Sequence, residues 1–285
     1  EAYYGYGLRY FTTTDMTADE IHQVGLDQVA EITARIEAIL RRQGMTEGTV
    51  GQRVAALSDI PGQVYPNTDA GKAQLLADLN GQMDQMNRML PNYFGRLPKS
   101  PCEVRRVPVE TEAGAPGGYY MPPALDGSRP GAYYINLRDT AEWPKFTLPT
   151  LTWHEAAPGH HFQIALQMEQ EEMPLLMRLV SFSANTEGWG LYAEQLADEM
   201  GIYADDPLGE IGYLQSLMFR SARLVVDTGL HAKRWSREQA IRYMVDTLGD
   251  QESAVATEVE RYCVWPGQAC SYKVGHNVWA KVRED

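Results

Sequence analysis

The segment TWHEAAPGHHFQ, residues 152–163, constrains this chain more than any other, because it places three histidines and a glutamate within eight positions. The chain has 285 residues and only six histidines. In the pattern H-E-x-x-H on one helix, two imidazoles hold zinc and the glutamate activates water. Here Pro158 and Gly159 separate the His-Glu pair from the next histidine. The segment therefore suggests a related metal site that needs an interruption of the helix.

An unbroken helix would not bring these imidazoles together. At about 100° per residue, His154 and His160 lie on different faces, and His161 lies about 10 Å further along the axis than His154. Pro158 cannot donate to the carbonyl of His154 and its ring displaces the backbone, while Gly159 tolerates the remaining dihedral angles. We expect a bulge or kink that brings His160 beside His154, as is found at many functional sites. The alternative is a buried helix with satisfied histidines.

Four segments of the chain resemble a bacterial family known as domain of unknown function 885. They are His154–Gln163, Ser128–Tyr134, Glu187–Glu194 and Trp265–Tyr272. The likeness covers nearly the whole chain. It implies a mainly helical, zincin-like metallopeptidase fold and peptide hydrolysis. Members of the family are longer, and this chain matches their C-terminal half, so we expect that it is the C-terminal part of a longer protein.

Hydrophobic periodicity predicts a mainly α (α+β) fold in a single catalytic domain, residues 1–285. Residues 1–90 read as a helical segment, in which a capping box at Thr17–Glu20 opens a helix that ends near Arg42, and a second helix covers about 69–90. Residues 91–149 are rich in proline and glycine and predict a small antiparallel sheet. Its strands are expected at Cys102–Val109, Gly117–Met121 and Ala132–Leu137.

Residues 150–285 form a helical metal-site region in this interpretation. Prolines and glycines punctuate the predicted helices. These helices cover residues 148–170 with a kink, 174–182, 184–200, 208–233, 237–247 and 252–262, and a last one follows Pro266.

A catalytic zinc commonly has three protein ligands. His154 and His160 supply two, and the third should be a carboxylate from another helix. Glu187 is the best candidate, because its distance downstream is similar to that in glutamate-type zincins. Gly188 and Gly190 are poor helix residues, which suggests that this helix closely approaches another backbone where it crosses the metal helix.

Two neighbouring residues have less certain roles. Glu194 follows Glu187 by seven residues and shares its face. It is either an acceptor that orients a ligating imidazole, a third ligand, or a solvated surface charge. His161 either supports a ligand in the same way or is itself an alternative ligand, ranked below His160.

The hydrolytic roles follow from the same chemistry. Glu155 is expected to act as the general base that takes a proton from the metal-activated water and passes it to the leaving amine. The developing oxyanion also needs a hydrogen-bond donor. Tyr272 is the first choice and His231 the second, and the sequence does not separate them because both depend on tertiary proximity.

Substrate binding has two candidate elements. An exposed strand edge can pair with the backbone of an extended peptide, and Gly118, Tyr119 and Tyr120 are the candidates for that edge. An ordinary hairpin is the alternative. Arg220 and Arg223 lie on a predicted helix that is largely apolar. Arg223 has Asp227 in ion-pair register four residues later, which favours a structural pair; facing a cleft, an arginine would instead grip the terminal carboxylate of a peptide.

Composition excludes several classes of function. The formal net charge of −13 argues against nucleic acid and anionic membrane surfaces as partners. No apolar run of about 18 residues could span a bilayer. Three cysteines make neither a disulfide framework nor a Cys-x-x-Cys metal site.

The leading hypothesis is therefore a metallopeptidase that uses Zn2+ and metal-activated water to hydrolyse peptide bonds, in particular those of short peptides. A second hypothesis is a non-catalytic, metal-stabilised peptide-binding protein. A third is a metal-dependent amidase or esterase that acts on a non-peptide substrate. The sequence leaves open the oligomeric state and whether the protein is periplasmic, secreted or cytoplasmic in a bacterium.

Overall fold

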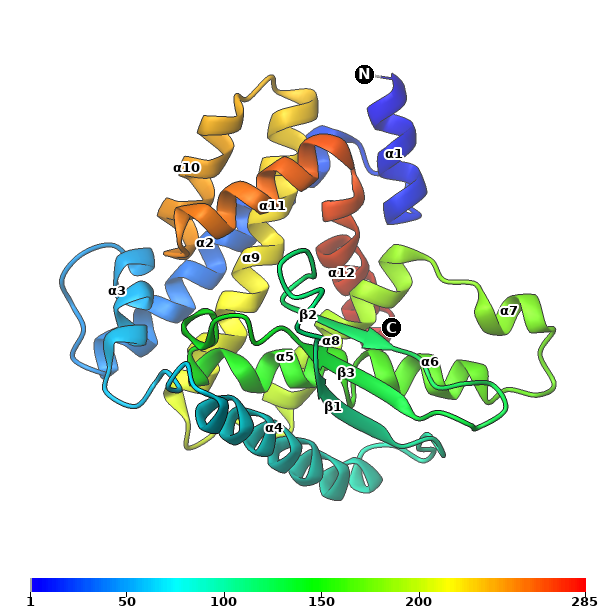
Figure 1. Ribbon diagram of the computed structural model, residues 1–285. Coiled ribbons are helices and arrows are strands. Elements are labelled where there is room, and N and C mark those ends of the chain that lie inside the picture. Colours follow the sequence, from blue (N-terminus) through cyan, green and yellow to red (C-terminus); the bar gives the residue numbers. More distant parts are fainter. Residues whose placement is uncertain (1) are drawn as a thin grey trace. The chain divides into compact units, whose positions relative to one another are not determined.

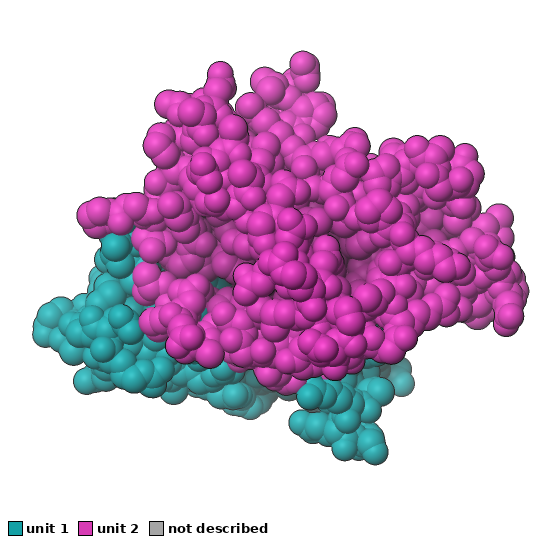
Figure 2. All heavy atoms as spheres, turned by 90° about the horizontal axis from the view of Figure 1, so that it is seen from below, with its two compact units in different colours: residues 1–60, 182–188, 210–285 teal, residues 61–181, 189–209 magenta. Residues whose placement is uncertain are grey.

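Helices account for most of the computed structural model, which describes residues 2–285, and three short strands form its sheet (Figure 1). The chain forms two compact units (Figure 2). Unit 1 contains residues up to 60, 182–188 and 210–285, and unit 2 contains residues 61–181 and 189–209. The predicted mainly α, α+β class is thus confirmed.

Unit 1 is helical throughout its regular elements. Its second helix begins with the predicted capping box, in which Thr17 and Glu20 each bond the backbone of the other, and ends at Arg42 as expected. Tyr4, Leu8 and Ile21 pack with Leu224 and Val274 in one buried cluster. The helices are α1 (Ala2–Thr12), α2 (Ala18–Arg42), α3 (Val50–Ala56), most of α9 (Pro207–Ala232), α10 (Arg237–Leu248), α11 (Glu252–Val264) and α12 (Ser271–Glu284).

Unit 2 contains the sheet and the helices that cover it. Leu75 and Leu79 of α4 form a buried cluster with Tyr133, Ile135 and Leu148, so α4 and the start of α5 pack on the strands. The elements are α4 (Asp69–Met89), β1 (Cys102–Arg106), β2 (Gly118–Met121), β3 (Gly131–Ile135), α5 (Leu148–Glu155), α6 (His160–Met168), α7 (Leu175–Leu179) and most of α8 (Ser183–Glu199).

The sheet is mixed rather than antiparallel, which corrects the prediction. Its strand order is β1-β3-β2. β2 runs antiparallel to β3, with Tyr120 opposite Tyr133, whereas β1 runs parallel to β3, with Val104 opposite Tyr133. The chain leaves β1, forms β2 at the far edge and returns through β3 in the centre. A β-type residue pattern carries no information about strand direction, so this topology was not accessible from it.

Two helices, α1 and α3, were not predicted. The α1 segment AYYGYGLRYFT contains two glycines and reads as an aromatic cluster rather than as a periodic helix. The α3 segment lies among Gly44, Gly48 and Gly51, which seemed to end regular structure. Tertiary packing overrides these weak local preferences. The helices predicted after residue 148 agree with the observed ones to within a few residues, apart from the break at Pro158.

Candidate metal centre

The predicted kink is a complete interruption between two helices. α5 ends at Glu155 and α6 begins at His160, and the peptide bond between Ala157 and Pro158 is cis. A Cβ atom on Gly159 would lie 1.9 Å from the carbonyl oxygen of His154, so only glycine fits there. The interruption thus replaces the turn of helix that would separate the two histidines.

A residue of α8 fixes this turn from outside. The indole nitrogen Nε1 of Trp189 donates to the carbonyl oxygen of Pro158 at 2.8 Å. The Trp189 ring also stacks against Phe162, the third residue of α6, with ring centroids 6.5 Å apart. The start of α6 is therefore held against α8.

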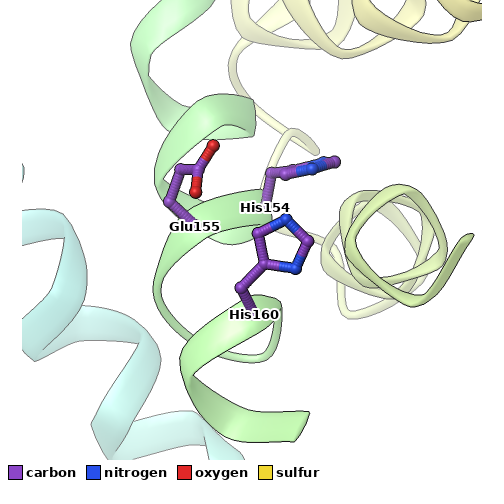
Figure 3. A group of neighbouring side chains, drawn as sticks. All are labelled: His154, Glu155 and His160. Carbon is purple, nitrogen blue, oxygen red and sulfur yellow. The ribbon is translucent and has the colours of Figure 1, made fainter. Parts of the chain in front are cut away.

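The break brings His154 and His160 together, as Figure 3 shows. Their ring centroids are 4.7 Å apart and the ring planes are nearly perpendicular, at 85°. Both residues are buried, and so is Glu155. One ligand-type atom from each of these three residues lies within 4.8 Å of the other two. These three residues form the one group among residues 2–285 whose spacing could hold a metal ion.

Glu194 of α8 orients the first imidazole. Its Oε1 accepts a hydrogen bond from Nδ1 of His154 at 2.7 Å, and its Oε2 accepts one from the hydroxyl of Thr150. Glu194 has no exposed surface, so it is not a solvated charge. Because a carboxylate accepts, the proton of the neutral imidazole lies on Nδ1 and the ring lone pair lies on Nε2. This arrangement is the usual support of a metal-binding histidine.

Gly190 makes room for both rings. A Cβ atom at this position would lie 2.8 Å from Nε2 of His154 and 3.0 Å from Cε1 of His160. The backbone of α8 can approach the two imidazoles only because the side chain is absent. The prediction was an approach to another backbone, whereas at Gly190 the neighbours are the side chains of the two histidines.

Glu155 turns towards the sheet rather than towards α8. The charge of its carboxylate adds to burial in raising the pKa of Tyr133 on β3. It also contributes, after burial and the neighbouring Glu103, to the rise in the pKa of Cys102 on β1 to about 12. Adjacent residues of a helix diverge by about 100°, which is why Glu155 and His154 face different elements.

His161 is separate from this group. Its Nε2 donates to the carbonyl oxygen of Ser100 at 2.9 Å, and its Nδ1 accepts from the hydroxyl of Tyr120 at 2.9 Å. Burial lowers the pKa of His161, which is consistent with the neutral ring that this pattern requires. Both ring nitrogens are engaged away from His154, so the structure does not place His161 as an alternative ligand beside it.

Glu187 lies in the part of α8 that belongs to unit 1. It is half-buried and precedes Gly190 by three residues, so the two share a helix face. Its neighbour Gly188 approaches α12, where an added Cβ would lie 2.4 Å from the carbonyl carbon of Gly275. The expected backbone approach at Gly188 is therefore to α12 and not to the metal helix. The role of Glu187 as third ligand stays a prediction.

Tyr272 belongs to the same unit as Glu187. Burial raises the pKa of Tyr272, and the carboxylate of Glu187 raises it further. The guanidinium group of Arg223 lies 4.6 Å from the centre of its ring.

His231 is less available as a donor. Its Nε2 donates to the carbonyl oxygen of Tyr262 at 2.9 Å, and its ring centroid lies 5.0 Å from that of Tyr4. One ring nitrogen is therefore committed to the fold. The choice between Tyr272 and His231 as the donor to the oxyanion stays a prediction.

Arg223 does not pair with Asp227, which corrects the expected ion pair. Its Nη2 bonds Glu258 of α11 at 2.9 Å and its Nε bonds the hydroxyl of Tyr262 at 2.9 Å. Asp227 instead accepts from the hydroxyl of Tyr4 at 2.7 Å and from the backbone nitrogen of Gly267. Arg223 therefore pairs with Glu258 on another helix and not with Asp227, four residues later on its own helix.

The predicted substrate strand β2 is an edge strand. Only β3 pairs with it among the described strands. Tyr119 stacks on Tyr134 with ring centroids 5.0 Å apart, and Gly118 lies beside the side chain of Leu151 in α5. Tyr120 is linked to His161 of α6 as described above. The edge strand β2 is thus packed against both α5 and α6.

Two contributors were missed by the sequence interpretation. Thr150 bonds Glu194 from the preceding turn of α5, and Tyr133 places a fully buried hydroxyl near Glu155. The Tyr133 hydroxyl has no hydrogen-bond partner within residues 2–285. Tyr133 lies in a segment that carries the family resemblance, and this could have identified it from the sequence. No sequence feature pointed to Thr150.

The residues present fit a zinc ion. Two imidazoles that face one point, one of them held by a buried carboxylate, are the donors that zinc prefers. The absence of a side chain at Gly190 leaves room for both rings. Glu155 lies beside these two candidate ligands.

Fold and site define an α+β protein with a candidate metal-binding pair of histidines on an interrupted helix. The family model described as "Bacterial protein of unknown function (DUF885)" matches residues 1–285, and the chain belongs to this family. No curated protein is similar to it.

The solved structures that are similar to this chain include two described as putative lipoproteins. A protein described as a putative lipoprotein from Colwellia psychrerythraea is 49% identical, with a TM-score of 0.97 over 99% of this chain and 48% of its own. A putative lipoprotein of unknown function from Shewanella oneidensis is 20% identical, with a TM-score of 0.82 over 100% of this chain and 53% of its own, and shows the fold alone. This chain spans about half the length of these proteins. No helix of residues 2–285 is long and apolar enough to cross a membrane.

Proposed function

We propose that this chain is the metal-site part of a zinc-dependent peptidase with a zincin-like arrangement. The observation that carries the proposal is the pairing of His154 with His160 across the helix break, with Glu194 bonded to Nδ1 of His154 at 2.7 Å. A merely structural histidine pair would not need a buried carboxylate on one ring and a glycine notch against both.

In this proposal His154, His160 and Glu187 hold the zinc ion. Zinc, when bound, supplies Lewis-acid chemistry that polarises the scissile carbonyl and activates water. Glu194 orients the ring of His154 and increases its basicity. Gly190 keeps α8 close to the rings, so Glu187, one turn earlier, can approach from the same helix face.

The protein groups then move one proton in two steps. Glu155 accepts a proton from the attacking water while the new C–O bond forms at the peptide carbonyl. As the C–N bond breaks, Glu155 passes that proton to the leaving amine, so each hydrolysis consumes one water. The hydroxyl of Tyr272 donates a hydrogen bond to the carbonyl oxygen as negative charge develops on it.

The substrate proposed for this chemistry is a short peptide in extended conformation. β2 is an edge strand whose outer backbone groups can pair with such a peptide, which is recognition by strand addition. Tyr119 and Tyr120 would then contact alternate side chains of the peptide. Because the similar protein from Colwellia psychrerythraea is described as a putative lipoprotein, we propose that the peptide is met outside the cytoplasm.

The test is a comparison of the zinc-loaded wild type with Glu155→Gln on a mixed peptide library. Glu155→Gln should keep its zinc and lose roughly 10²- to 10⁴-fold in kcat. Glu199→Gln, at an exposed position near the end of α8, is the matched control and should keep full activity. Unchanged hydrolysis in Glu155→Gln would refute the assignment.

The other two functions give different results in the same experiment. Peptide binding without cleavage by the wild type would indicate a metal-stabilised binding protein. Cleavage of non-peptide amides or esters but not of peptides would indicate an amidase or esterase, since the same groups attack any activated carbonyl. Assaying this chain beside the longer protein from Colwellia psychrerythraea tests whether the additional half is needed.

A further inference from the structure

Two arginines of α9 lie against the ring of Tyr272. The guanidinium carbon of Arg223 is 4.6 Å from the ring centre and that of Arg220 is 6.0 Å from it. The ring centre of Phe219, which directly precedes Arg220 in the sequence, lies 4.3 Å from the guanidinium carbon of Arg223 and 5.5 Å from that of Arg220. Both cations therefore sit among aromatic faces, which stabilise them and hold their orientation.

This cluster contains more positive charge than its own acids balance. Glu258 accepts hydrogen bonds from Arg223 and Arg261, and these two arginines pull its pKa down to about 2 although burial opposes them. Arg220 donates only to Ser216, from Nη1 to the hydroxyl at 2.6 Å and to the carbonyl at 3.4 Å. Within residues 2–285, Arg220 has no carboxylate partner. The carboxylate of Glu258 thus pairs with two of the three guanidinium groups in the cluster, and Arg220 is the third.

Two buried guanidinium nitrogens lack partners in the part of the chain that the structure describes. They are Nε of Arg220 and Nη1 of Arg223. Arg223 is only 6% exposed, so water does not readily replace the missing acceptor. A buried donor without an acceptor costs about 1–3 kcal/mol. In a chain with a net charge of −13, this concentration of unbalanced cations requires an explanation.

We propose that Arg220 and Arg223 form an anion site beside Tyr272 that receives the free C-terminal carboxylate of a peptide substrate. The proposal rests on the proposed function, because it places the site next to the donor for the scissile carbonyl. A guanidinium group presents parallel N–H groups that match the two oxygens of a carboxylate. Arg220 is half-buried and would bind the carboxylate directly. Arg223, held by Glu258 and Tyr262, would add positive charge without direct contact.

The position of Arg220 and Arg223 beside Tyr272 indicates which substrates the proposed site would accept. The same ring that would donate to the carbonyl of the cleaved bond carries the two cations on its face. A carboxylate bound by these cations would therefore lie beside the carbonyl group to which Tyr272 is proposed to donate. The expected substrates are short peptides with an unblocked C-terminus, from which one or two residues are removed.

Three peptides that differ only at the C-terminus test the inference. The first has a free C-terminus, the second a C-terminal amide, and the third an amide with glutamate as its last residue, which separates a terminal from a side-chain carboxylate. We expect kcat/KM to fall at least about tenfold for both amides, the effect of one lost charge-assisted hydrogen bond. Equal cleavage of the free acid and the plain amide would overturn the proposal, and full activity on the glutamate amide would overturn its terminal assignment.

A binding measurement keeps this test separate from that of the peptidase proposal. Calorimetry with the zinc-loaded Glu155→Gln variant should show at least about tenfold tighter binding of the free acid than of the amide. Arg220→Ala should abolish that preference and Arg220→Lys should restore part of it. Arg237→Ala removes an equal charge from an exposed ion pair with Glu260 and should leave the preference unchanged. Loss of the preference in Arg237→Ala, or its persistence in Arg220→Ala, refutes the site even where no peptide is cleaved.

Discussion

Glu194 and His154, forty residues apart in the chain, form a buried hydrogen bond of 2.7 Å between Oε1 and Nδ1. The bond fixes both the tautomer and the orientation of the imidazole, because the second carboxylate oxygen is held by Thr150. A histidine oriented in this way presents Nε2 in one direction only. The position of any metal ion is thus defined before the ion arrives.

Loss of this carboxylate should weaken metal binding. Glu194→Gln keeps the size of the side chain but accepts a weaker hydrogen bond from His154, and it should lower zinc affinity by roughly 10- to 100-fold. Competition with a chromophoric chelator measures the change. Glu199→Gln lies on the same helix at an exposed position and should bind zinc like the wild type. Equal affinities in the two variants would contradict the role given to Glu194.

Zinc binding should also depend on the absence of a side chain at Gly190. An added methyl group would collide with both imidazoles at 2.8 and 3.0 Å, so Gly190→Ala should remove most of the bound zinc. Gly81→Ala is the matched control, because Gly81 lies in the exposed middle of α4 with no atom within 4 Å of an added Cβ. That variant should keep its zinc and gain about 0.5–1 kcal/mol of stability. Zinc content by elemental analysis and thermal unfolding decide the outcome.

The adjacent histidines should behave differently. His160 faces His154, whereas His161 is bonded to Ser100 and Tyr120. His160→Asn should therefore lose zinc, and His161→Asn should keep zinc while losing about 1–3 kcal/mol of stability from its broken hydrogen bonds. Elemental analysis and urea unfolding separate the two effects. Loss of zinc from His161→Asn alone would reverse the assignment.

The crossing of α8 and α12 should tolerate no side chain. A Cβ on Gly275 would lie 2.0 Å from the carbonyl oxygen of Ala184, and one on Gly188 would lie 2.4 Å from the backbone of Gly275. Gly275→Ala should therefore destabilise the protein by about 1–3 kcal/mol or more, as overpacked interiors do. Urea unfolding measures this, again with Gly81→Ala as the control. A stability equal to that of the wild type would show that the helices do not meet at these glycines.

The buried Asp227 predicts a pH dependence of stability. Burial raises its pKa to about 6 in the folded protein, above the ordinary value of 3.8. The folded state therefore binds more protons between about pH 4 and 6, and the free energy of unfolding should fall as the pH rises through that window. Asp227→Asn should lack this fall, so the difference between the two proteins should change by on the order of 1–3 kcal/mol. A difference independent of pH would contradict the raised pKa.

The sequence was most informative where the chemistry is local. Pro158 and Gly159 act on the backbone directly, so the interruption of the helix and the meeting of His154 with His160 could be inferred from them. The capping box at Thr17 and Glu20 is equally local and marked the start of α2 correctly.

Tertiary relationships were less accessible. Arg223 was assigned to the acid four residues away, but its partner Glu258 lies on another helix, and no periodicity encodes that choice. For Glu194 three roles remained open, because burial alone separates an orienting carboxylate from a surface charge. The direction of β1 was wrong in the predicted sheet for the same reason: residue pattern shows which face is covered but not how strands are ordered.

On α8, Gly190 and Glu194 are separated by four residues, and each faces His154. One residue inserted between them would rotate one relative to the other by about 100°. The imidazole of His154 could then have either the space left by Gly190 or the hydrogen bond to Glu194, but not both. Insertions and deletions between these two residues are thus not expected in a chain that binds metal in this way. The spacing G-x-x-x-E can therefore be used to recognise other chains with the same support for the histidine.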